Sequence, residues 1–434
     1  MATSTTGTRG LRIRTTFVLF QHFVRKEYAI MTIEALIEAY QDCLRKKRNS
    51  PNAIRFEMNN EVLLAELLED INSRKYSPSQ SIAFVVTRPK YREVFAADFR
   101  DRIVHHYIAM RVTPILESII NPRSYNCRKG KGTLAGIEQL SEDIRICSNN
   151  YTTDCWVAKV DIKGFFMSIS RVLLFKKTDG LIVKYYKGND IDDLRFLAER
   201  TILNSPEKNC IKQSPEWMWK YITKDKSLFT NGENMGVPIG NLPSQILANY
   251  FIDFLDWMFE KEGIKYHVRY VDDIAIVSNN KEKILHSISL ARELLDKCGI
   301  TLHPKKFYMQ YYLKGVQFTG AILKPGRIYI TKRVVHDFEE SVRNIENAKT
   351  IQEITHSVAS LNSYLGAMNH FKTYAIRRRI LQNAKIYDKV YIAGHYEKIV
   401  IRGKYNYERF IKNEIKSKRW HKSKNFSIPM QTST

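Results

Sequence analysis

The 434-residue chain is too long for one ordinary compact domain, and its 44% of hydrophobic residues can form a substantial core. Its 69 lysines and arginines exceed its 45 aspartates and glutamates, which gives a formal charge of +24. This charge predicts a polyanionic partner such as nucleic acid, and no apolar run is long enough to predict a membrane span.

The first thirty residues contain an apolar run after two arginines that is weakly similar to a signal peptide. Gln21 and His22 interrupt this run, and no small-residue cleavage site follows, so we interpret 1–30 as an N-terminal extension of unknown role. The cysteines form neither a CxxC pair nor a zinc-ligand pattern, and we expect reduced thiols in a cytoplasmic protein. They are Cys43, Cys127, Cys147, Cys155, Cys210 and Cys298.

The chain from Met31 to about Ser77 has helical periodicity. Residues 81–102 then predict a strand, a basic turn and a second strand, before a helix that begins at Asp101. In this hairpin, Lys90 and Arg92 could place their positively charged groups over a phosphate chain. A solvated basic turn explains the segment equally well.

A basic glycine-containing loop, SYNCRKGKGT, follows at 124–133. Its glycines allow the backbone to approach a phosphodiester, and its cations are Arg128, Lys129 and Lys131. The spacing differs from that of a nucleotide-binding P-loop. We therefore predict a template-strand contact, with an exposed flexible loop as the alternative.

The next buried strand, CWVAKV, ends on Asp161, which is followed by Phe165 and Phe166. An aspartate at this place either caps the following turn or is a ligand whose burial a cation compensates. A long insertion near 171–235 has helical and loop character. Residues 236–256 then predict a glycine-rich turn that runs into one helix ending at Gly263.

The segment YHVRYVDDIAIVS at 266–278 alternates apolar and polar residues on both sides of a Val-Asp-Asp step. It predicts a hairpin with Asp272 and Asp273 at its tip. Such a pair can be a simple turn former or a metal site. A helix at 284–298 and a strand at 315–323 follow, and past Thr331 the pattern is helical throughout.

The basic C-terminal segment, 396–434, interleaves lysines and arginines with aromatic rings. This composition is typical of nucleic-acid binding through phosphate neutralisation and stacking. An ordinary solvated helix with a disordered tail explains it equally well.

Three carboxylates, those of Asp161, Asp272 and Asp273, converge if their two strands pair. Two divalent cations bound there would stabilise the attacking and leaving oxygens of an in-line phosphoryl displacement. Mg²⁺ is the expected ion because carboxylate oxygens are hard ligands. The predicted reaction is attack of a primer 3′-hydroxyl on the α-phosphate of a deoxynucleotide, with release of pyrophosphate.

Eight motifs in order between 82 and 323 resemble those of reverse transcriptases. They read RPKYREVF, FRDRIVHH, SYNCRKGKG, VDIKGFF, GVPIGNLPSQ, YVDD, LHPKK and VQFTG. The resemblance implies an α+β right-hand polymerase with an antiparallel palm sheet. We expect fingers and the start of the palm at 31–155, palm with the insertion at 156–330, and a helical thumb at 331–395.

The resemblance also implies roles for individual residues. Asp161 and Asp272 correspond to the metal ligands, with Asp273 as the third active-site carboxylate. Phe166 corresponds to the steric gate that excludes a ribonucleotide 2′-hydroxyl. The residues that correspond to contacts of the incoming nucleotide are Arg92, Lys90, Ile239 and Gly240. Lys306 corresponds to the lysine that protonates pyrophosphate, with Lys305 as the alternative.

Ile239 marks a departure, because most reverse transcriptases carry glutamine before this glycine. The aliphatic residue, and the segments Pro206–Cys210 and Ser227–Phe229, are similar to enzymes of diversity-generating retroelements. This type of enzyme implies low fidelity, a template RNA and a DNA or RNA primer, and a small basic accessory protein. The alternatives are an antiviral-defence reverse transcriptase with a dedicated noncoding RNA and a non-catalytic RNA-binding splicing helper.

Overall fold

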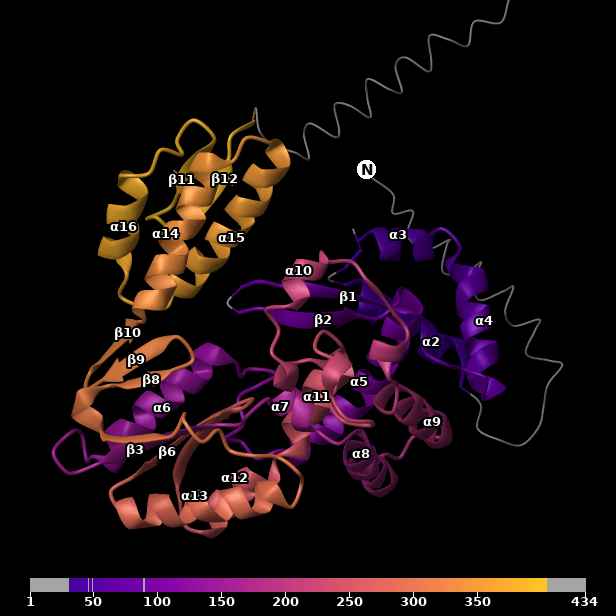
Figure 1. Ribbon diagram of the computed structural model, residues 1–434, viewed down its shortest axis with the longest axis horizontal. Coiled ribbons are helices and arrows are strands. Elements are labelled where there is room, and N and C mark those ends of the chain that lie inside the picture. The colour runs from indigo at the N-terminus through magenta and orange to yellow at the C-terminus, as the bar shows by residue number, and fades with distance from the viewer. Residues whose placement is uncertain (1–30, 46, 49, 89, 404–434) are drawn as a thin grey trace, which may run out of the picture. The chain divides into compact units, whose positions relative to one another are not determined.

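The computed structural model describes residues 31–45, 47–48, 50–88 and 90–403 (Figure 1). The predicted N-terminal extension and most of the predicted basic tail lie outside these residues. Contacts divide the chain into two units, Met1–Gly136 with Ala158–Met309 and Ile137–Val157 with Gln310–Thr434. None of the described helices is both long and apolar enough to cross a membrane.

Helices at the start of the first unit pack their apolar faces together, as the helical periodicity predicts. These helices are α2 (Ile33–Leu44), α3 (Pro51–Glu57) and α4 (Asn60–Asn72), and α2 and α3 contact the long helix α5 (Phe99–Ile119). Rings of Tyr40, Phe56 and Phe99 meet between them, with centroids 5.1 to 6.2 Å apart. Asp98 caps α5, so this helix begins two residues before its predicted start.

A three-stranded sheet, which we call the fingers sheet, has the order β2-β1-β4. The predicted antiparallel hairpin of β1 (Ser81–Val86) and β2 (Arg92–Ala96) is confirmed. The third strand, β4 (Cys210–Lys212), comes from the insertion and pairs parallel to β1. Its three residues are too few for an alternating pattern to reveal it.

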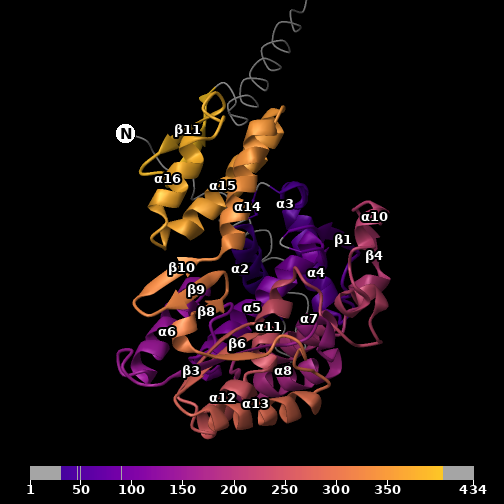
Figure 2. The same cartoon turned by 60° about the vertical axis from the view of Figure 1, so that its left-hand side comes forward.

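The second sheet of this unit has the order β5-β6-β3-β7, and we call it the palm sheet. Its strands are β5 (Tyr266–Tyr270), β6 (Asp273–Ser278), β3 (Trp156–Asp161) and β7 (Tyr308–Tyr311). The hairpin of β5 and β6 and the adjacency of β6 and β3 are confirmed. Helices α12 (Phe254–Lys261) and α13 (Lys281–Asp296) lie along it in both views (Figures 1 and 2).

The palm hairpin has the predicted tight turn, but Asp273 belongs to the strand and not to the tip of the turn. Tyr270 pairs with Asp273, so Asp273 starts β6 and only Val271 and Asp272 form the connection. Val271 has a φ of 57°, a left-handed conformation that a β-branched residue rarely adopts. The tight two-residue turn imposes this conformation because it reverses the chain between two paired strands.

The single helix predicted from 242 to 263 is two helices, α11 (Leu242–Phe251) and α12. The prediction was wrong because tertiary contacts hold the break. Lys177 of α8 (Arg171–Tyr185) donates to the carbonyls of Tyr250 and Phe251 at 2.8 and 3.0 Å. Asp253 accepts from the Asn121 backbone amide at 2.9 Å. The contacts of Lys177 satisfy two carbonyls that an unbroken helix would pair internally, and the contact of Asp253 ties the break to the end of α5.

The second unit begins its C-terminal part with a three-stranded antiparallel sheet. Its strands are β8 (Val316–Phe318), β9 (Ala321–Lys324) and β10 (Arg327–Ile330), in the order β10-β9-β8. The strand predicted at 315–323 is therefore a hairpin. Thr319 and Gly320 turn the chain with φ values of 41° and 94°.

Past Thr331 the structure is mostly helical, with α14 (Lys332–Asn347), α15 (Ile351–Asn369) and α16 (Tyr374–Gln382). Its core includes apolar residues at helical spacing on α14 and α15: Phe338, Val342, Ile345, Ile354, Val358, Leu361, Leu365 and Met368. A hairpin of β11 (Val390–Ala393) and β12 (Lys398–Ile401) was missed, so the region is not wholly helical. Asn362 of α15 pairs with both backbone groups of Ile399, at 2.8 and 2.7 Å, and joins this hairpin to the helix.

A buried ionic network joins the palm hairpin to α11 and α12. Arg269 of β5 is fully buried and donates to Asp256 of α12 and Asn249 of α11, each at 2.7 Å. Burial by itself raises the pKa of Asp256, but Arg269 and His267 outweigh it, so the pKa lies below its ordinary value. Ser124 extends the network by donating to Asn249 at 2.8 Å.

We expect Asp256→Ala to lower the free energy of unfolding by about 3–5 kcal/mol, because it removes the nearest counter-ion of the buried Arg269 guanidinium and leaves only the more distant carboxylate of Asp253, at 3.7 Å. Urea denaturation measures the change. The control is Glu233→Ala, which removes the partner of Lys208 in an exposed ion pair and costs about 1 kcal/mol or less. Equal losses in the two variants would contradict this account of the network.

Candidate active site

Three predicted carboxylates lie close together at one end of the palm sheet. Asp161 is the last residue of β3, Asp273 is the first residue of the neighbouring β6, and Asp272 precedes it. Burial, together with the negative charges of Asp273 and Asp161, raises the pKa of Asp272 to about 6. The structure therefore brings all three carboxylates within electrostatic reach of one another.

Two lysines contact these carboxylates. The Nζ atom of Lys306 lies 2.8 Å from both side-chain oxygens of Asp161. The Nζ atom of Lys159 lies 3.1 Å from Oδ1 of Asp273. Sequence reasoning missed Lys159, although it stands two positions before Asp161 in a strand and therefore points to the same face. Asp161 and Asp273 thus each have an ammonium group as a partner.

The donor set suits a divalent cation. Carboxylate oxygens are the hard ligands that Mg²⁺ prefers, and the raised pKa of Asp272 reflects negative charge that a cation would relieve. Ligand atoms of the three aspartates do not all lie within 4.8 Å of one another. The Lys306 ammonium contacts both side-chain oxygens of Asp161 and would therefore compete with a cation for this carboxylate.

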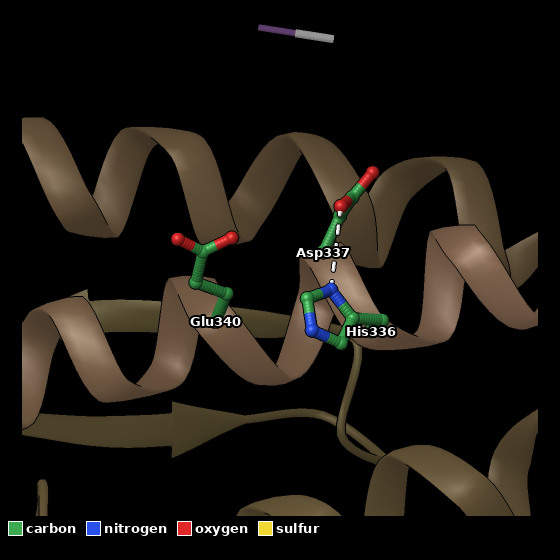
Figure 3. Close-up of side chains that lie close together, drawn as sticks. All are labelled: His336, Asp337 and Glu340. Carbon is green, nitrogen blue, oxygen red and sulfur yellow. Dashed lines mark ion pairs between the residues drawn. The ribbon is translucent and has the colours of Figure 1, made fainter.

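Within the described part of the chain, one group does bring three such atoms within 4.8 Å: His336, Asp337 and Glu340 of α14 (Figure 3). His336 is exposed, and its Nδ1 atom lies 3.7 Å from Asp337. Arg333 also lies 3.8 Å from Asp337. Exposed charged groups at this helical spacing form ordinary ion pairs, and we assign no function to this group.

The fingers sheet places Arg92 near the carboxylates. Arg92 is the first residue of β2, is exposed, and acts to lower the pKa of Asp272. Lys90 is exposed in the turn that precedes it. These positions leave both cations available to a ligand that bridges the fingers hairpin and the carboxylates.

Phe166 and Ile239 pack against the same small core cluster, which contains Phe95 of β2. The Phe95 amide donates to the Ile239 carbonyl at 2.8 Å. Gly240 has a φ of 117°, and a Cβ there would lie 2.8 Å from the Phe95 carbonyl oxygen and from Val94. A glycine is required because β2 approaches this backbone so closely.

The cations of the basic loop make contacts within the chain. Arg128 donates to Glu117 at 2.9 Å, and Lys131 donates to the Pro122 carbonyl at 2.9 Å. These two contacts hold the loop near the end of α5, and the template contact of Arg128 and Lys131 stays a prediction. Lys129 is exposed, and its template contact stays a prediction.

The two segments that mark the insertion are attached to the fingers sheet. Ser227 donates to buried Glu93 of β2 at 2.7 Å, and the Leu228 amide donates to the same carboxylate. Burial raises the pKa of Glu93, against these hydrogen bonds. Cys210 opens β4, so both segments are structural parts of this sheet.

A family model described as "Reverse transcriptase (RNA-dependent DNA polymerase)" matches residues 80–323. A curated relative, "Putative COX1/OXI3 intron 2 protein" of Saccharomyces cerevisiae, is 24% identical over 235 residues. That match covers 53% of this chain and 24% of the relative. The chain thus spans about a quarter of the curated relative.

Two similar solved structures are telomerases. Apo telomerase from Candida tropicalis has a TM-score of 0.44 and 12% identity, and the match covers 70% of this chain and 56% of that chain. Telomerase from Candida albicans, in complex with a TWJ fragment of telomeric RNA, has a TM-score of 0.41 and 11% identity. That match covers 72% of this chain and 58% of the telomerase chain.

We expect Lys306→Ala to tighten Mn²⁺ binding about two- to fivefold in the absence of nucleotide, because it removes the ammonium that competes for Asp161. Titration calorimetry measures the affinity. Lys305→Ala is the matched control, since Lys305 is a neighbouring exposed lysine. Equal Mn²⁺ affinities for the two variants would show that the contact with Asp161 does not limit cation binding.

Proposed function

This chain belongs to the reverse transcriptase family, and we propose on that premise that it copies a template RNA into cDNA as an RNA-directed DNA polymerase. The observation that carries the proposal is the adjacency of β3 and β6, which collects Asp161, Asp272 and Asp273. Neighbouring carboxylates of this kind are costly without a cation, which favours a catalytic site over a purely structural one.

The proposed reaction joins the 3′-oxygen of a primer to the α-phosphorus of a deoxynucleoside triphosphate and releases pyrophosphate. When bound, two Mg²⁺ ions would supply charge stabilisation for the attacking and leaving oxygens. Asp161, Asp272 and Asp273 are the residues that would hold them. Protein groups in such a reaction mainly position the reactants and neutralise charge.

The other predicted residues have matching tasks in this proposal. Arg92 and Lys90 orient the triphosphate from the fingers hairpin. Phe166 occupies the space that a 2′-hydroxyl would need. Lys306, released from Asp161, donates a proton to the leaving pyrophosphate.

We further propose a low-fidelity enzyme of the diversity-generating retroelement type. Ile239 packs against the apolar cluster of the fingers sheet and offers no side-chain hydrogen bond beside the nucleotide site. A site without such a polar group discriminates less strongly between matched and mismatched pairs. The insertion segments that attach to β1 and β2 are a second point of similarity to that type.

This proposal includes partners and a compartment. A primer, deoxynucleoside triphosphates and a small basic accessory protein would act with the template RNA in the cytoplasm. An antiviral-defence enzyme with a dedicated noncoding RNA is the alternative within the same family. The intron-encoded yeast relative keeps a non-catalytic splicing helper as a third candidate, and the carboxylate cluster argues against it.

We expect Asp272→Asn to abolish primer extension on an RNA template, because it removes one of the three carboxylates that would hold the cations. Gel-resolved extension of a labelled primer measures activity. Asp296→Asn, an exposed change at the end of α13, is the control and keeps wild-type activity. Extension by the Asp272→Asn protein would exclude the proposed active site.

We expect Ile239→Gln to reduce misincorporation opposite template adenine roughly two- to tenfold, the range that one neutral hydrogen bond can supply. Sequencing of extension products measures the error rate. Ile211→Gln makes the same change at an exposed position of β4 and leaves the error rate unchanged. The idea fails if the wild type is already accurate and Ile239→Gln leaves its error rate unchanged.

A further inference from the structure

Three aromatic rings meet at the surface of the fingers sheet, and we call them the fingers aromatic patch: Tyr91, Trp217 and Tyr221. The Tyr91 and Tyr221 rings stack with centroids 4.7 Å apart and planes at 24°. Trp217 meets Tyr221 edge-on, with centroids 6.2 Å apart and planes at 90°. The patch therefore joins the turn before β2 to the insertion around α10 (Glu216–Trp219).

Two of the three rings are exposed to solvent, and Tyr91 is half-buried. Trp217 is 52% exposed and Tyr221 is 61% exposed. A single exposed aromatic residue is ordinary on a protein surface, whereas exposed apolar side chains in mutual contact mark an interaction site. Nothing in the proposed reaction uses these rings, so their exposure calls for a separate role.

The patch stands on a fixed support. Trp219, two residues after Trp217, turns inward, packs against Phe229 at 5.4 Å and donates to the Ser214 carbonyl at 3.1 Å. The Ser214 hydroxyl in turn accepts from the Val85 amide of β1 at 2.9 Å. Figures 1 and 2 both show α10 beside this sheet. Because these contacts already fix the segment that carries the patch, the segment loses little conformational entropy when a ligand binds.

Cations surround the rings. The sequence from 86 to 92 contains three cations and no acid, and that from 212 to 226 contains four lysines and two acids. Lys90, Lys220, Lys224 and Lys226 are exposed. Protein interfaces are depleted in lysine, whereas surfaces for single-stranded nucleic acid combine rings that stack on bases with cations that neutralise phosphates.

We propose that the fingers aromatic patch binds unpaired bases of single-stranded RNA, while the adjacent lysines neutralise its phosphates. RNA as the occupant rests on the proposed polymerase function. One residue of the patch, Tyr91, stands between Lys90 and Arg92 in the sequence. The bound RNA strand therefore lies at the same hairpin that carries the proposed triphosphate contacts. A protein partner is the competing occupant.

The test is equilibrium binding of a labelled 20-nucleotide single-stranded RNA to the full chain, in chelator and without nucleotides. We expect Trp217→Ala and Tyr221→Ala each to weaken binding about tenfold, and Trp217→Phe to restore it because a ring remains. Tyr185→Ala is the matched control, since Tyr185 is a 41% exposed ring with Lys184 above it. Its affinity stays that of the wild type.

Two further measurements separate stacking from charge and from catalysis. The ring variants keep the wild-type dependence of affinity on salt and bind blunt duplex unchanged, whereas Lys220→Ala reduces the salt dependence. Wild-type RNA affinity in Trp217→Ala, or an equal loss of duplex binding, overturns the proposal and favours a protein partner. Because binding is measured without nucleotide, loss of RNA binding by the ring variants stands even if the wild type proves unable to extend a primer.

Discussion

The buried contact of Arg269 with Asp256 and Asn249 is the constraint on which the candidate active site depends. Arg269 lies two residues before the loop that carries Asp272, and its guanidinium is fixed by side chains of two different helices. Its backbone also pairs with Arg123 and Tyr125 on the other side. The position of β5 is therefore set from several directions, and β6 follows it through their shared register.

Charge balance is the second theme of the site. Three carboxylates lie together at the proposed cation site. Lys306 pairs with Asp161, and Lys159 pairs with Asp273. Burial and the neighbouring carboxylates of Asp273 and Asp161 raise the pKa of Asp272. This arrangement keeps the carboxylates folded together without a bound ion and leaves them ready to exchange an ammonium for one.

The sequence was most informative where a local pattern coincided with burial. Alternation around Asp272 identified the hairpin, and an apolar strand ending on Asp161 identified its neighbour, so the carboxylate cluster could be predicted from chemistry alone. Strand β4 and the break before Asp253 could not, because both depend on partners far along the chain. The contact of Arg128 with Glu117 could not be predicted for the same reason, since nothing in the segment around Arg128 indicates this partner.

The left-handed conformation of Val271 has a consequence for how the site behaves over time. A backbone held in a sparsely populated region costs of order 1–3 kcal/mol, and it persists only where the surroundings leave no other choice. A glycine at this position could adopt several backbone conformations, and the side chain of Asp272 would then take several orientations. Valine has fewer accessible backbone conformations than glycine. The turn is therefore more rigid, and the chain beside Asp272 keeps one orientation at the cost of this strain.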